Sequence, residues 1–500
     1  MAEKFELHKR RHPDYLNQID NWNFFISAYK GGTGFVSDHL FTHRLENGAD
    51  FINRKARAYY LNYCRPLPNI YTEYLYKNQV TRPKDFLEVQ ENIDGQGTGI
   101  GIFMPKVATL ASIYGQCHVV VDMARDNEGI SKAEAKQPYV SIYTPEHVVD
   151  WSRNPENGQL RWVLLHEPEY IDDNPMQARA LVNKYRLMTT EGWEVYGINK
   201  KGKSEIIDSG TWNLGVVPLA TCYHRDIDTD MIGESMLVDI APVNRIVMNW
   251  CSCLDEQIER QTFSQLVMQE GLGTSSDGKA LKGIGTAAIF TYPADAKNAP
   301  SYISPDTSQL ETIWQMIERH VGEIYRMAVL EKSGDAMMVA QSGIAKAYDF
   351  VDTNGAMISK ATAMERFENE LFTILAAWNG KSELNEDIKY DKDFDVINME
   401  KDIKNSLDLV AEGISGTFNS LIYKRLVRRS LTNATQRDLT VIDKEIDVSG
   451  GGISSNVNME HDEHDNEDGD VPAKDISPEI ETKPVDETKV VEKEKVDVTE

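Results

Sequence analysis

The sequence has few cysteines and no long hydrophobic run. Its five cysteines are odd in number and scattered over 500 residues, which predicts reduced thiols in a reducing compartment. Only Cys251 and Cys253 are close together, and a lone C-x-C pair is a poor zinc pattern. No stretch approaches the roughly 20 apolar residues of a membrane span, and the charged first residues lead into no apolar secretion segment. We therefore expect an aqueous, reducing environment and no membrane partner.

Positive charge is also scarce. The chain has 53 Lys and Arg against 79 Asp and Glu, a formal net charge of -26. A simple nucleic-acid binder needs clustered Lys and Arg to contact phosphates, so this balance argues against that class. The acidic balance does not exclude nucleic acid as a passing cargo. A channel that must let DNA slide without binding it is better lined by acidic than by basic side chains.

Sequences that imitate nucleotide sites are incomplete. "GTSSDGKA" (273–280) has the spacing of a phosphate loop, but Ala280 stands where Mg²⁺ binding needs a hydroxyl, and the loop follows a helical pattern. "DGQGTGIG" (94–101) lacks the third Gly of a dinucleotide loop. "VVVD", ending at Asp122, is better explained as a buried strand with a terminal acid. Ser342 and Lys346 have the wrong spacing for a nucleophile and its base. We expect no catalytic residue, no cofactor and no metal site.

The last 51 residues differ in composition from the rest. Residues 460–500 contain 16 acidic residues and five lysines, with few large apolar side chains. Such a segment cannot bury enough apolar surface to order itself, so we expect a disordered acidic tail over 450–500. His461 and His464 would give it only weak, non-specific cation binding.

The first half of the chain shows an α+β pattern. Residues 14–80 have helical spacing, with a stop at Gly31–Gly32 and interruptions at Pro66 and Pro68. A further helix is expected over 106–118, followed by the "VVVD" strand. Residues 138–223 alternate between β-rich runs and turn signals, which predicts an antiparallel meander packed on the N-terminal helices.

Two long helices are predicted next, over 236–269 and 306–330. Each has an apolar stripe with steps of three and four residues, comprising Ile240, Val243, Val247, Trp250, Leu254 and Ile258 in the first and Leu310, Ile313, Trp314, Ile317, Val321, Ile324 and Ala328 in the second. The excursion 271–304 between them contains a strand-like run, "TAAIFTY". A loop over 331–341 then leads to a very long helix with Gly355 inside it, where we expect a kink.

The C-terminal part continues with a strand-like run, "EDIKYDKDFDVIN" (386–398), and two short helices around Gly413 and Gly416.

The order of these segments resembles that of tailed-bacteriophage portal proteins, the dodecameric head–tail connectors. Four phrases carry the resemblance: "WNFFISAYKGG" (22–32), "RKARAYYLNYCRPLPNIYTEYLYK" (54–77), "YTPEHVVDW" (143–151) and "GVVPLATCYH" (215–224). The first two look like the portal N-terminal region. The third resembles the entry into the portal wing sheet, and the fourth resembles the turn into the stem. The resemblance covers about residues 14–440.

This resemblance implies a portal fold and a division of the chain. The expected parts are a wing of N-terminal helices and β meander (1–235), stem helix 1 (236–270), a small α/β clip (271–305), stem helix 2 (306–330), a tunnel loop (331–341), a kinked helix returning to the wing (342–399), a helical crown (400–449) and the acidic tail (450–500). A ring of such subunits, usually twelve, would stand at one capsid vertex, and double-stranded DNA would enter and leave through its channel.

The resemblance also implies site residues and partners. The residues expected at the DNA channel are Glu331, Lys332, Ser333, Gly334, Asp335, Met337, Met338, Gln341 and Lys346. Those expected in the clip, where the terminase large subunit and later a head-completion adaptor would dock, are Gly273, Asp277, Lys279, Lys282, Tyr292, Asp295 and Lys297. Major capsid and scaffolding proteins would be further partners. The protein would be found in the host cytoplasm during assembly and then in the virion.

Two other classes stay open from the residues alone. One is a helical scaffold or adaptor that never contacts DNA, and the other is a nucleotide-dependent cytosolic enzyme. A ring with a central hole would separate the portal from the scaffold, and a nucleotide titration would test the enzyme.

Overall fold

The computed structural model describes most of the chain before the acidic tail. The described residues are 6–44, 46–123, 137–172, 176, 178–199, 201–226, 231–262, 265–267, 301–303, 308–328, 343–381, 384–392, 394, 406–411, 415–431 and 436–448. All of them belong to one compact unit, Met1–Gly452. The predicted tail lies outside the described residues.

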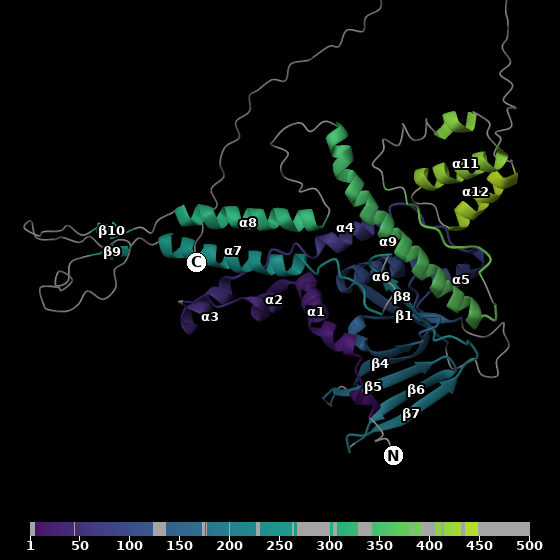
Figure 1. The fold of residues 1–500 in the computed structure, drawn as a ribbon, viewed down its shortest axis with the longest axis horizontal. Helices are drawn as coiled ribbons and strands as arrows, with labels where there is room; N and C mark the ends of the chain where they lie inside the picture. Colours follow the sequence, from purple (N-terminus) through teal and green to yellow (C-terminus); the bar gives the residue numbers. More distant parts are fainter. Residues whose placement is uncertain are drawn as a thin grey trace, which may run out of the picture. The chain divides into compact units, whose positions relative to one another are not determined.

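The described part is α+β, as predicted, and begins with helices (Figure 1). These are η1 (Leu7–Lys9), α1 (Pro13–Lys30), α2 (Gly32–His39), α3 (Gly48–Arg57), α4 (Pro66–Leu75), η2 (Lys84–Phe86), α5 (Leu87–Glu91) and α6 (Ile100–Tyr114). The predicted stop after α1 is confirmed, since Gly31 has a φ of 61°. The interruption expected at Pro66 is confirmed, since the chain is not helical between Arg57 and Pro66. Pro66 itself begins α4, because proline is tolerated in the first turn, where its missing N–H has no helical partner. The interruption expected at Pro68 is wrong, since Pro68 lies inside α4.

Strands β1 to β8 form two antiparallel sheets, where the sequence predicts one meander. The first sheet has the order β2 (Tyr139–Tyr143), β1 (Gln116–Asp122), β8 (Leu219–Tyr223). The second is a meander of β3 (Val148–Arg153), β4 (Leu160–Ile171), β5 (Ala180–Thr189), β6 (Gly192–Ile198) and β7 (Ser204–Thr211). A 3₁₀ turn, η4 (Pro145–His147), links β2 to β3.

The predicted helix 106–118 ends earlier than expected. Gly115 has a φ of 90°, so it terminates α6 in the left-handed conformation, and Gln116 already belongs to β1.

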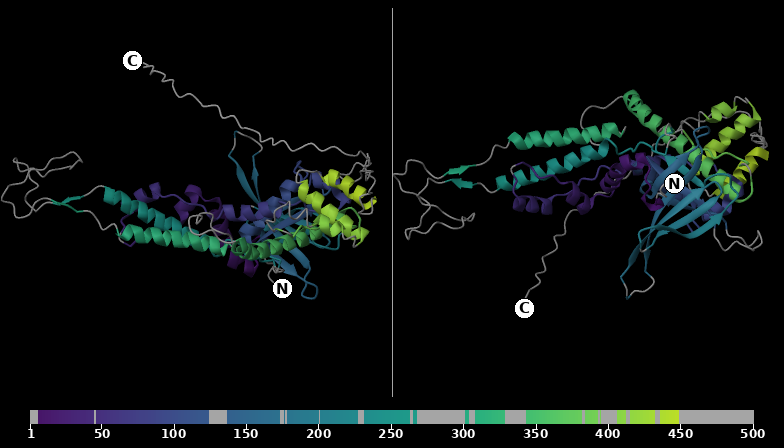
Figure 2. Two further views of the ribbon diagram at one scale, coloured as in Figure 1. Left: turned by 90° about the horizontal axis from the view of Figure 1, so that it is seen from above. Right: turned by 60° about the horizontal axis from the view of Figure 1, so that its bottom comes forward.

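Two long helices, α7 (Ile240–Thr262) and α8 (Ser308–Met327), pack side by side (Figures 1 and 2). The helix predicted to reach residue 269 is shorter, because residues 265–267 form strand β9 (Gln265–Val267). This strand pairs antiparallel with β10 (Ser301–Ile303). Backbone pairing between the two chain segments replaces helical hydrogen bonds there. The helical pair is thus joined to a two-stranded ribbon, and the "TAAIFTY" run lies outside the described residues.

Most of the remaining described chain is helical. Helix α9 (Gly343–Trp378) runs uninterrupted through Gly355, so the glycine does not end the helix, and the bend predicted there stays a prediction. The strand expected over 386–398 is wrong within its described residues, where Lys389 forms only an isolated bridge with Thr81. Residues 406–411 are helical, and α11 (Gly416–Ser430) packs on α12 (Gln436–Val448), a helix that the sequence did not lead us to expect.

The apolar interior has two clusters. One joins α1, α2, the meander, α7 and α8, with Trp22 and Val247 among its buried members. The other joins α4, α6, β1, β8 and α9, with Met104 and Phe367 at its centre. Helix α6 has residues in both clusters, so burial on its two faces ties the helical pair to the α9 region.

Candidate assembly surface on the paired helices

The predicted apolar stripes bring α7 and α8 together. Val247 in α7 and Ile317 and Ile324 in α8 are buried in one cluster, as periodic apolar positions on facing helices should be. Other stripe members remain open to solvent within the single chain. Trp250 and Ile258 on α7 are 39% and 46% exposed, and Trp314 on α8 is 49% exposed.

The exposed positions on α7 form a row that we call the α7 ridge. It consists of Ile246, Trp250, Leu254 and Ile258, which follow one another at four-residue steps and therefore line one side of the helix. Three of the four are exposed, and Leu254 is half-buried. An exposed apolar row of this kind is a candidate interaction surface.

The N-terminal segment holds α7 through side chains that lie outside the ridge. The amide of Asn244 is fully buried. Its Oδ1 accepts hydrogen bonds from the Tyr60 hydroxyl (2.6 Å) and the Tyr63 N–H (3.0 Å), and its Nδ2 donates to the Leu61 carbonyl (2.8 Å). One turn further, Asn249 Oδ1 accepts from the backbone N–H of Phe41 at 2.8 Å. These bonds set the rotation of α7, so the ridge keeps a defined direction.

A buried ion cluster locks α3 to the same helix. The Arg54 guanidinium, 2% exposed, donates Nε to Glu46 Oε1 at 2.7 Å and a terminal nitrogen to Ser252 Oγ at 3.0 Å. Its hydrogen bonds, and to a smaller extent its charge, hold the pKa of the Glu46 carboxyl below the usual range. Glu256 Oε2 lies 3.5 Å from Arg54 Nε.

The same cluster has the composition of a metal site but not its electrostatics. His43, Glu46 and Glu256 offer three ligand atoms within 4.8 Å of one another. Arg54 already takes both oxygens of Glu46 and lies beside Glu256. A second cation in this place would be repelled by a permanently charged guanidinium. The cluster therefore fixes α3 on α7 rather than binding an ion.

The predicted channel and clip residues lie outside the described residues. This holds for Glu331 to Gln341 and for every clip position from Gly273 to Lys297. Lys346 belongs to the first turn of α9, and its side chain is outside the description. The structure therefore leaves these assignments as predictions.

Two other features singled out in the sequence are described. Asp122, the acid that ends "VVVD", accepts from a terminal nitrogen of Arg186 at 2.9 Å, which gives this carboxylate a structural role at the end of β1. All five cysteines are free thiols, and burial raises the pKa of Cys64 to about 12. Among the described helices, none combines the length and apolar character needed to cross a bilayer.

Sequence reasoning missed a cavity of about 670 Å³ bounded by β3, β8 and α9. Its charged and aromatic lining includes Arg153, Tyr223, Arg366 and Glu370. These residues come from three elements far apart in the chain, and no motif connects them. Only the fold brings them together.

Comparisons with known proteins identify neither a family nor a function for this chain. No protein-family model and no curated protein matches the chain. Among solved structures, a chain from the virion of the native gene transfer agent particle aligns with a TM-score of 0.39 and 10% identity. The alignment covers 84% of this chain and 96% of that chain. This likeness is too low to assign a fold family or a function.

Proposed function

We propose that the protein is the subunit of a phage portal, a ring that conducts double-stranded DNA through one vertex of a capsid. One observation carries the proposal: two long helices pack as a pair, lead into a two-stranded ribbon, and keep a solvent-exposed apolar ridge. The order of segments in the sequence, which resembles that of portal proteins, supports it.

The ridge explains why a single chain is incomplete. Exposed Trp250 and Ile258 would lie against a different surface of a neighbouring copy, a head-to-tail contact that closes into a ring when the rotation permits. Transfer of one large apolar side chain out of water contributes roughly 1.5–3 kcal/mol, so even a few such residues per subunit favour association.

The charge of the chain suits a conduit. A net charge of -26 per subunit disfavours lasting phosphate contacts, since strong binding through counterion release would hold DNA in place. In this proposal Lys332 and Lys346 would touch passing phosphates lightly, while the clip would receive the terminase large subunit and later a head-completion adaptor.

Negative-stain images and native mass measurement of the purified full chain test the proposal. A portal gives annular particles with a central hole, and a mass that is a multiple of 56.6 kDa, near twelvefold. Single chains or open filaments over the whole concentration range would refute the ring. Rings whose hole is closed would favour the scaffold or adaptor class instead.

A further inference from the structure

The cavity between β3, β8 and α9 holds two arginines and is built within one chain. Arg153 comes from the end of β3, and Arg366 from the middle of α9. The Arg366 guanidinium donates to the Asp226 carbonyl at 2.8 Å and lies over the Tyr223 ring, 5.7 Å from its centroid. These contacts hold one positive charge at the wall of the cavity.

Two buried polar atoms of the lining lack a normal partner. The Tyr223 hydroxyl and the Arg153 Nε are buried and make no hydrogen bond of normal geometry with the described residues. Tyr223 is 5% exposed, and burial raises the pKa of its hydroxyl. The neighbouring Arg153 side chain opposes this rise through its charge and through a hydrogen bond of poor geometry, so the two groups are neighbours that satisfy each other only in part. A ligand with acceptor atoms could give both groups hydrogen bonds of better geometry.

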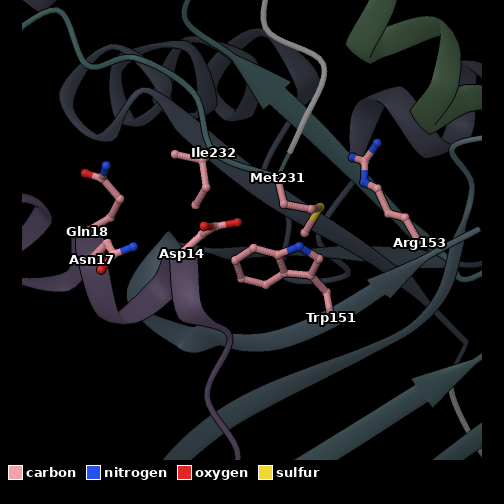
Figure 3. A pocket seen from close by; sticks show the side chains of 7 residues that line it. All are labelled: Asp14, Asn17, Gln18, Trp151, Arg153, Met231 and Ile232. Carbon is pink, nitrogen blue, oxygen red and sulfur yellow. The ribbon is translucent and has the colours of Figure 1, made fainter. Parts of the chain in front are cut away.

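Arg153 also borders a smaller cavity of about 300 Å³, drawn in Figure 3. In that view Arg153 lies on the far side of Trp151 from Asn17 and Gln18. The smaller cavity offers one carboxylate, Asp14, and no second arginine. The paired positive charges therefore belong to the larger cavity.

A carboxyl group of the chain itself already lines the larger cavity. Glu370 follows Arg366 by one helical turn and lines the same space, where the backbone N–H of Thr221 acts on it as a hydrogen-bond donor. Partial loss of water around its carboxyl raises its pKa to about 7, against the lowering effect of both arginines, although the residue as a whole is exposed to solvent. Below that pH the two arginines face a neutral carboxyl.

The apolar lining and the strands at the sheet edges indicate what kind of molecule carries the acidic group. Leu160, Val217, Leu219 and Ile374 contribute apolar surface, and the volume is within the roughly 300–1,000 Å³ range of ligand sites. β3 and β8 are each the end strand of their sheets. Part of each edge is already engaged, because the His12 N–H donates to the Val149 carbonyl of β3 and the Thr221 N–H of β8 to Glu370. An extended segment would therefore be held mainly by its side chains in the cavity.

We propose that this cavity binds a short, extended peptide segment of a partner protein, with an acidic side chain placed between Arg153 and Arg366 and apolar side chains on either side. The site goes beyond the conduit function and does not rest on it, because one chain forms all of its walls. A ring that forms normally and binds no such peptide would therefore overturn only this inference.

The test uses the purified full chain and a fluorescein-labelled hexapeptide of alternating Glu and Val, followed by fluorescence anisotropy. We expect saturable binding at pH 6.5, weakened at least tenfold in the Arg153→Gln/Arg366→Gln double variant. Arg161→Gln, which removes a nearby charge outside the cavity lining, is the matched control and should bind as the parent does. Thr373→Trp provides a second route, because the added ring fills the cavity and leaves both arginines in place.

Three results would overturn the proposal. The first is equal binding by a Lys–Val hexapeptide. The second is unchanged affinity in both the double variant and Thr373→Trp. The third is a Glu–Gly hexapeptide that binds as well as Glu–Val and is fully displaced by inorganic phosphate, which would make the cavity a site for simple anions.

Discussion

Arg82 and Glu368, 286 residues apart, form a two-pronged ion pair inside the protein. Arg82 Nε donates to one carboxylate oxygen at 2.8 Å and a terminal nitrogen to the other at 2.9 Å. The Glu368 side chain is fully buried, and the Tyr390 hydroxyl also donates to it. The pair fastens the segment after α4 to α9, the helix that follows the predicted tunnel loop.

Replacing Glu368 by Gln leaves the Arg82 charge buried without its counterion. We expect the free energy of unfolding to fall by about 3–5 kcal/mol, as when one partner of a buried pair is removed. Urea unfolding followed by circular dichroism measures it. Asp85→Asn, which breaks the exposed pair with Lys381, is the control and should cost less than about 1 kcal/mol. A loss in Glu368→Gln no greater than in the control would contradict a structural role for the pair.

Lys360 is predicted to make the free energy of unfolding vary with pH in the alkaline range. Its ammonium, 1% exposed, donates to the Ala108 carbonyl at 2.9 Å and to Ser112 Oγ at 2.5 Å. His224 Nδ1 is 3.4 Å away. Burial lowers the pKa of Lys360 to about 8. The unfolded chain, with an ordinary lysine, therefore binds more protons than the native state between pH 8 and about 10.5, and stability must rise through that range.

Lys360→Met removes this contribution. From pH 7.5 to 10.5, the stability of the parent should gain about 3 kcal/mol relative to the variant. Urea unfolding of both proteins at a series of pH values measures the difference, in which the titration of other groups cancels. Parallel stability curves for the two proteins would rule out a depressed lysine pKa.

Gly115 is predicted to be irreplaceable by alanine. It has a φ of 90°, and an added Cβ would lie 2.2 Å from the Gly233 carbonyl oxygen, a backbone atom that cannot move aside. We expect Gly115→Ala to lower the free energy of unfolding by more than about 2 kcal/mol, from strain and overpacking together.

Gly101→Ala is the matched control, because Gly101 lies in α6 with open space around its Cα. It should stabilise the protein by up to about 1 kcal/mol. Thermal unfolding of the two variants should therefore shift in opposite directions. A shift in the same direction would contradict the close approach of the two glycines.

Sequence patterns predicted the elements that are determined by residues close together in the chain. Gly31 ended α1 as expected, and the spacing from Ile240 to Ile258 predicted α7. The patterns failed where distant segments decide. β9 ends the α7 pattern early because β10 pairs with it, and Gly115 ends α6 because the chain turns there against Gly233. The cavity depends on tertiary structure, since Arg153 on β3 and the residues of β8 and α9 that line it are far apart in the sequence.

Glu370 gives peptide binding a predicted pH dependence. Its pKa of about 7 means that raising the pH from 6 to 8 adds a negative charge beside Arg153 and Arg366, which should repel an acidic peptide. We expect the Glu–Val hexapeptide to bind several-fold more weakly at pH 8 than at pH 6. In Glu370→Gln the affinity should stay nearly constant, as anisotropy titrations at both pH values would show. An equal loss in parent and variant would place the titrating group elsewhere.

The α7 ridge should decide assembly without affecting the fold. Trp250→Glu and Ile258→Glu each place a charge where the proposed ring buries an apolar side chain, while both side chains are open to solvent in one chain. We expect the circular dichroism spectrum to stay unchanged. The protein concentration needed for rings should rise by about tenfold or more, since each 1.4 kcal/mol of lost association free energy is a factor of ten. Tyr170→Glu, at an exposed position on β4, is the control and should assemble as the parent does. Mass photometry across a dilution series measures this, and rings that persist equally in all three variants would show that the ridge does not lie between subunits.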